Sequence, residues 1–153
     1  MFTSSRCWIA VAVLGCCCLL TGCTSGYKPP EGVTVTGVIL LDGKPLEVPN
    51  RQAGLGNVEV ILVPQGELAT SGAEPFSDLA KEDGSFTIAG PGDGIKPGKY
   101  KLVVHQQDQG FGSDMLKGEF SETKSPIEVE VPASKSGGKH DLGKMDLATY
   151  RKQ

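Results

Sequence analysis

Residues 24–153 contain no cysteine, because all five cysteines of the chain lie between Cys7 and Cys23. Histidine is scarce as well: the two histidines, His105 and His140, are far apart in the sequence. This part of the chain therefore lacks disulfides, cysteine metal sites and the closely spaced histidines that zinc sites use. It also lacks the EF-hand pattern and the G-x-S-x-G nucleophile motif. We expect no cofactor, no metal and no enzymatic activity.

Positive charge is also in short supply. Lys and Arg number 15 against 18 Asp and Glu, so the net charge is −3, which argues against nucleic acid as a partner. Long apolar runs are scarce too. The segment WIAVAVLGCCCLL at residues 8–20 is uncharged but shorter than the roughly 20 residues that a membrane-spanning helix needs. Its length is typical of the hydrophobic part of a secretory signal peptide.

Small residues follow this apolar run, in the sequence Leu20-Thr21-Gly22-Cys23. The segment resembles the bacterial lipobox, in which a leucine and two small residues precede an obligatory cysteine. The resemblance implies that residues 1–22 are a lipoprotein signal peptide, that the Cys23 thiol receives diacylglycerol, and that the new amino group is acylated. Several acyl chains anchor a protein stably, whereas one chain does so only marginally. The alternative is an ordinary signal peptide in which Cys23 plays no part.

The rest of the chain divides into a tether, one domain and a short tail. Residues 23–32 hold the lipidated cysteine and the sequence TSGYKPPEG, whose small residues, glycines and prolines are typical of a tether. Residues 33–148 are long enough to form one domain with its own core. Residues 149–153 are the expected C-terminal tail.

Apolar and polar residues alternate with a period of two in five segments, as they do in half-buried β-strands. These segments are residues 33–41, 58–63, 85–90, 100–106 and 127–131. Weaker strand candidates are residues 76–80 and 141–147. No stretch of ten or more residues has a helical pattern with caps. About seven short strands predict an all-β fold, a β-sandwich.

The alternation also predicts which side chains enter the core. The expected inward-facing residues are Val33, Val35, Ile39, Leu41, Val58, Val60, Leu62, Phe86, Ile88, Tyr100, Leu102 and Val104. On the opposite face of the fourth strand we expect Lys101, Val103 and His105 to be exposed to water. Asp42-Gly43 predicts a hairpin turn after the first strand, and Asp83-Gly84 predicts a turn before the third.

Two longer loops are expected at residues 106–125 and 132–140, and loops of that length are often functional. The first loop contains two aromatic residues, Phe111 and Phe120. If exposed, these rings form a candidate ligand-contact pair that stacks on a sugar or holds a protein partner. The alternative is that both rings fold back and cover the open end of the sandwich.

Three segments share their order and spacing with a known family. VTGVILLDGKPLEVPN…NVEVILVP is similar to the opening G-x-V-x-x-D-G-K-P-L…V-x-V-x-F of carboxypeptidase regulatory-like, or transthyretin-like, domains. KEDGSFTIAG is similar to their T-D-x-x-G-x-F-x-L, and KPGKYKLVV to their x-P-G-x-Y-x-V-x-V. The match covers about residues 34–105 and implies an Ig-like, transthyretin-like (prealbumin-like) sandwich of about seven strands. A lipobox, a tether and one such domain are together similar to small lipoproteins of planctomycetes.

Domains of this family act mostly as accessory or binding modules, so the resemblance implies a non-catalytic lipoprotein of the cell envelope. Its expected partners are membrane lipid, through the acyl groups, and an envelope protein or glycan that the sequence does not identify. Thr24 is not the aspartate that retains many lipoproteins at the inner membrane. By this resemblance the outer membrane is somewhat favoured.

Two alternative functions are open at this point. One is a structural envelope component that assembles through its strand edges. The other is a transthyretin-like hydrolase of the 5-hydroxyisourate type, whose chain ends in Tyr-Arg-Gly-Ser. Here Tyr150-Arg151 matches that ending only in part, and the histidine that this enzyme has in its first strand is missing from residues 33–41.

Overall fold

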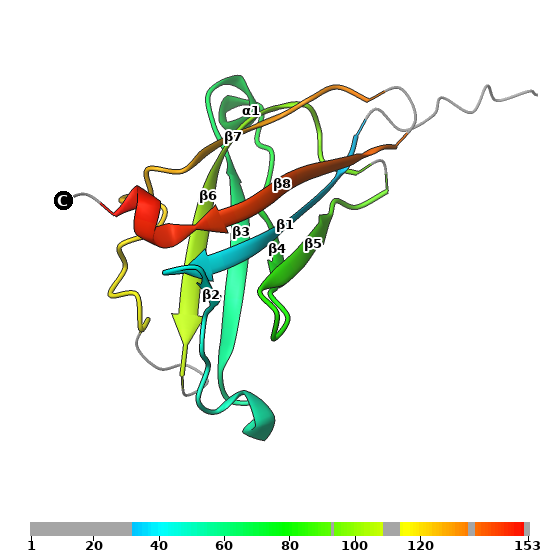
Figure 1. Ribbon diagram of the computed structural model, residues 1–153. Coiled ribbons are helices and arrows are strands. Elements are labelled where there is room, and N and C mark those ends of the chain that lie inside the picture. Colours follow the sequence, from blue (N-terminus) through cyan, green and yellow to red (C-terminus); the bar gives the residue numbers. More distant parts are fainter. Residues whose placement is uncertain (1–31, 93, 109–113, 135–136, 152–153) are drawn as a thin grey trace, which may run out of the picture.

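Two four-stranded β-sheets share one core in the computed structural model, which describes residues 32–92, 94–108, 114–134 and 137–151 (Figure 1). The fold is all-β and sandwich-like, as the alternating segments predict. The signal peptide at residues 1–22, the lipobox cysteine Cys23 and the loop residue Phe111 lie outside the described residues. No helix in the described ranges is long and apolar enough to cross a membrane.

Strand β1 (Thr34–Leu41) is the centre of the first sheet. On one edge it pairs with β8 (Lys139–Asp146), and the two strands run parallel to each other (Figure 1). On its other edge it pairs antiparallel with β5 (Ser85–Ala89) and with the two-residue β2 (Lys44–Pro45). Residues 141–146 of the weak candidate at 141–147 are therefore part of a strand beside the first one, and Leu147 lies just beyond that strand.

The second sheet has the strand order β4-β3-β6-β7, and all its neighbours are antiparallel. Its strands are β4 (Phe76–Leu79), β3 (Asn57–Pro64), β6 (Gly98–Gln107) and β7 (Glu128–Val131). β4 confirms the other weak candidate. The helices within the described ranges are short, and they are η1 (Arg51–Ala53), α1 (Glu67–Thr70) and η2 (Leu147–Tyr150).

The hairpin turn predicted at Asp42-Gly43 is confirmed. Leu41 pairs with Lys44 across it, so the turn has two central residues. Their φ angles are 54° and 75°. Positive φ at both central residues is the mark of a type I′ turn, whose twist matches the twist of the two strands that it joins.

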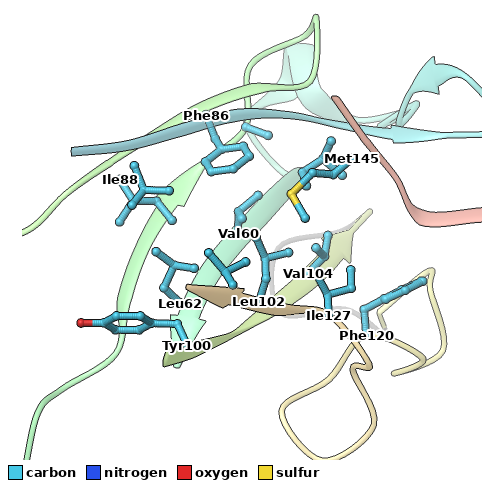
Figure 2. Packing of buried hydrophobic residues seen from close by; sticks show 14 of the residues in the cluster. Val60, Leu62, Phe86, Ile88, Tyr100, Leu102, Val104, Phe120, Ile127 and Met145 are labelled. Carbon is cyan, nitrogen blue, oxygen red and sulfur yellow. The ribbon is translucent and has the colours of Figure 1, made fainter. Parts of the chain in front are cut away.

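The apolar core lies between the two sheets (Figure 2). Phe86 and Met145 of the first sheet face Val60 and Leu102 of the second. The predicted inward-facing residues are buried, except Leu41, which is half-buried. Each fully buried Val, Leu, Ile or Phe side chain stabilises the fold by about 1.5–3 kcal/mol relative to its exposed state. This core alone must stabilise a sandwich that has no cysteine to cross-link it.

One residue of β6, Val103, departs from a simple apolar-in, polar-out pattern. The alternation predicts Val103 on the wet face, and this prediction is wrong, since its side chain is 1 % exposed. β6 is an interior strand, with Ile61 of β3 beside Val103 on one edge and the segment 114–127 along the other. In a strand with neighbours on both edges, side chains of the adjacent segments surround those on its outer face, so alternation alone does not decide the burial of Val103.

Tyr100, which is predicted to face inward, is fully buried. Its hydroxyl donates to the Lys96 carbonyl oxygen at 2.9 Å, and burial raises the pKa of Tyr100.

Gly37 lies directly opposite Phe86 in the ladder between β1 and β5, and the Phe86 ring covers it. A Cβ atom at position 37 would lie 2.8 Å from Cζ of Phe86, closer than such atoms approach in proteins. The glycine therefore leaves room for the aromatic ring that the first sheet contributes to the core.

Gly37→Ala is expected to lower the free energy of unfolding by about 1–3 kcal/mol, because overpacking pushes the Phe86 ring out of its place. Urea unfolding followed by circular dichroism measures the change. In a Phe86→Leu background the same substitution should cost clearly less, because the ring that clashes is gone. Equal costs in the two backgrounds would contradict this role of Gly37.

Candidate functional site

The described chain enters the sandwich at one end, and three grooves lie at the other. Gly32 leads into β1, whose start is held by the pairing of Val33 with Ile95 and by a 2.9 Å hydrogen bond from Thr34 N to Gly138 O. We call this the entry end. β1 then runs for eight residues, roughly 26 Å of extended chain, to the opposite end, which we call the far end.

The three grooves of the far end adjoin one another. The C-terminal groove, of about 490 Å³, lies between residues 119–126 and residues 150–151. The hairpin groove, of about 770 Å³, lies between residues 44–52 and Glu82. A middle groove of about 360 Å³ shares residues with both, and Arg151 is the residue that it shares with the C-terminal groove.

One wall of the C-terminal groove belongs to the segment 114–127, whose start is held by Asp114. The Asp114 carboxylate accepts hydrogen bonds from the backbone nitrogens of Gln106 at 2.9 Å, Leu116 at 3.1 Å and Gly118 at 2.8 Å. One side chain thus closes a turn within the segment and attaches it to the end of β6. The loop expected at residues 106–125 is therefore built into the fold over its described part.

The same segment takes the place of a strand along the edge of β6. Backbone hydrogen bonds join Leu102 N to Ile127 O at 2.9 Å and Val104 N to Phe120 O at 3.1 Å. The Phe120 ring lies beside Val104 and Ile127 in the core and is 1 % exposed (Figure 2). In this structure the Phe120 ring is buried in the core, and the residue is also one of those that line the C-terminal groove.

The other wall is the C-terminal segment, which Asp146 fixes in place. The Asp146 carboxylate accepts hydrogen bonds from the backbone nitrogens of Asp42 at 3.0 Å, Gly43 at 2.6 Å and Ala148 at 3.0 Å. It thereby joins the turn between β1 and β2 to the start of η2. The fold continues past residue 148, where the sequence predicts a tail, and includes residues 149–151.

The side chains that line the C-terminal groove are aromatic, polar and charged, and they include Glu119, Thr123, Lys124, Pro126, Tyr150 and Arg151. The Nε atom of Arg151 donates to Oε2 of Glu119 at 2.8 Å, and the two side chains are 42 % and 46 % exposed. An ion pair this exposed contributes at most about 1 kcal/mol, so it opens at little cost. The volume of the groove falls within the range of about 300–1,000 Å³ that is usual for ligand sites.

The two histidines of the chain are placed apart. His105 lies on β6 in the second sheet, whereas His140 lies on β8 in the first and not in the loop expected at residues 132–140. The Asp83 carboxylate accepts a hydrogen bond from the backbone nitrogen of Ser85, two residues on, and so stabilises the turn that contains it. Hydrogen bonds from the hydroxyl and the backbone amide of Ser85 lower the pKa of Asp83. Among the described residues, no group of three or more His, Cys, Asp or Glu side chains is placed to hold a metal ion.

No protein-family model matches the chain, and no curated protein matches it in sequence. Its function is therefore inferred from its residues and their geometry. The C-terminal groove is the candidate site, because it combines an aromatic side chain that is 37 % exposed, Tyr150, with the charged side chains of Lys124 and Arg151.

Asp146→Ala is expected to lower the free energy of unfolding by about 1–2 kcal/mol, because three backbone amides lose their acceptor. Asp141→Ala is the matched control: Asp141 lies on the same strand, and its carboxylate accepts a hydrogen bond from Gly143 N. Urea unfolding should give a clearly smaller loss for this control. Similar losses would mean that Asp146 does not fix the turn and η2 together.

Proposed function

We propose that this protein is a lipoprotein of the bacterial cell envelope and that its β-sandwich is a non-catalytic binding module. The observation that carries the proposal is the sequence Leu20-Thr21-Gly22-Cys23 directly after an uncharged apolar run. Cleavage before Cys23 removes the other four cysteines, so the lipidated residue is the one cysteine of the mature chain. The acyl groups then hold the protein at the membrane surface.

The position of the grooves supports a binding role. The tether expected at residues 23–32 joins the sandwich at the entry end, because Gly32 leads directly into β1. The three grooves lie at the far end, roughly 26 Å away along β1. An anchored domain of this shape holds its grooves away from the membrane, where an envelope protein or glycan reaches them.

We further infer that the sandwich is of the carboxypeptidase regulatory-like, or transthyretin-like, type that small planctomycete lipoproteins carry. The places of the shared motif residues support this inference: Asp42-Gly43 forms the hairpin turn, and Phe86 and Tyr100 enter the core. Gly84, which precedes Phe86 in the second motif, has a φ of 79°, a conformation that favours glycine. By the same resemblance, Thr24 after the lipidated cysteine favours the outer membrane.

A structural component that assembles through strand edges is the less favoured alternative. β8 is an edge of the first sheet and carries a bulge, since its register with β1 shifts between Thr36 and Val38. Bulges and charged side chains such as those of Lys139 and Lys144 discourage pairing between sheet edges. The hydrolase alternative is disfavoured by the first strand, in which the expected histidine is missing.

Cys23→Ser is expected to abolish acylation and retention in the membrane, because the serine hydroxyl does not replace the thiol as the lipid acceptor. Cys18→Ser is the matched control, since it makes the same atom exchange within the signal peptide and should leave acylation intact. Expression in a bacterial host, membrane fractionation and intact-mass spectrometry measure both properties. Wild-type protein with an intact N-terminus at Met1, or with an unmodified Cys23, would contradict the lipoprotein proposal.

A further inference from the structure

The C-terminal groove is locally positive in a chain whose net charge is −3. Two cations, Lys124 and Arg151, and one anion, Glu119, line it. Lys124 is exposed. The side-chain hydrogen bond that Arg151 makes within the described residues uses Nε, which leaves the two terminal nitrogens of the guanidinium group for a ligand. The charge of the groove therefore favours an anionic ligand.

Arg151 already binds the kind of group that we expect in such a ligand. Its Nε atom lies 2.8 Å from Oε2 of Glu119, which is a hydrogen bond between a guanidinium group and a carboxylate. The planar donors of arginine match a carboxylate or a phosphate with two parallel hydrogen bonds. Because the pair with Glu119 is exposed and weak, the carboxylate of a ligand can replace that of Glu119.

The groove also has an aromatic and an aliphatic ring among its lining side chains. Tyr150 is 37 % exposed, and Pro126 lines the same groove. A tyrosine ring has an apolar face and a polar tip, and Thr123 adds a further hydroxyl group. Such a surface matches a sugar ring, which has apolar C–H faces and hydroxyl edges.

The walls of the groove argue against an extended peptide as the ligand. They are the loop at residues 119–126 and the end of η2, not a free strand edge. An extended peptide binds a sheet mainly through a ladder of backbone hydrogen bonds, and these walls provide no such ladder.

We propose that the C-terminal groove binds a carboxylate-bearing saccharide, a uronate. Its carboxylate replaces Glu119 on Arg151, its ring lies on Tyr150, and Lys124 adds a second positive charge. The inference rests on the proposed function in one respect, that the sandwich is a binding module. It does not depend on lipid attachment at Cys23.

Isothermal titration calorimetry of the full-length protein, purified in detergent, tests the proposal with an oligogalacturonate as the probe. Oligogalactose, which lacks the carboxylates, and poly-glutamate, which lacks the rings, are the control ligands. The expected result is saturable binding of the oligogalacturonate and at least about tenfold weaker binding of both controls. Intact-mass spectrometry of the same sample reports acylation of Cys23 separately, so a failure of the anchor and a failure of the groove are distinguishable.

Four variants assign the binding to the groove. Arg151→Gln should weaken it several-fold, since an ion pair this exposed is weak, and Tyr150→Ala should also weaken it several-fold. Glu119→Gln should strengthen it, because Arg151 then loses its internal carboxylate. Lys96→Gln removes a charge at the entry end and should leave the affinity unchanged. Circular dichroism confirms that each variant is folded.

Several outcomes would overturn the proposal. They are the absence of oligogalacturonate binding to the folded wild-type protein, equal binding of poly-glutamate, and equal losses in Arg151→Gln and Lys96→Gln. Weaker binding in Glu119→Gln would overturn the exchange of carboxylates on Arg151. If Cys23 is acylated but oligogalacturonate does not bind, the lipid anchor stands and the uronate is excluded as the ligand of the C-terminal groove.

Discussion

Packing of two apolar sheet faces on each other is the interaction on which the rest of this structure depends. Residues 24–153 have no cysteine, so no disulfide joins the sheets and their side chains must fit closely. The fit is visible where the Phe86 ring covers Gly37 on the neighbouring strand. β1 is central to this arrangement, since it contributes core residues and has paired strands on both edges.

The parallel pairing of β8 with β1 brings the end of the described chain to the far end of the sandwich. Asp146 then binds the first hairpin turn and starts η2, and Arg151 reaches Glu119 in the segment that flanks β6. The C-terminal groove is therefore made by segments that are far apart in the sequence. Its geometry therefore depends on the pairing of β8 with β1 and on the segment 114–127, not on one loop.

Local patterns account for most of what the sequence predicts correctly. A period of two in apolar residues identifies the strands and their inner faces, and Asp42-Gly43 identifies the hairpin turn, because both depend on neighbouring residues alone. The sequence could also have pointed to Asp146, since an aspartate before a helical turn is a frequent N-cap. Its partners Asp42 and Gly43 are more than a hundred positions away and leave no local signal.

The sequence predicts the candidate site less well, because that site is formed by segments that are far apart in the chain. Phe120 and Phe111 attract attention as aromatics in a long loop, yet Phe120 is buried by the edge of β6, a neighbour that the sequence does not reveal. Val103 is also buried. The pair of Arg151 and Glu119, which the sequence does not predict, arises when two distant segments meet.

The most direct test of the account is a chemical-shift titration of isotope-labelled full-length protein in detergent with a saccharide extract of a bacterial envelope. We predict changes at the far end, strongest at the backbone amides of Thr123, Tyr150 and Arg151. Changes confined to the entry end, around Ile95 and Gly138, would contradict the proposal that the far end of the sandwich is its binding surface, as would the absence of any change.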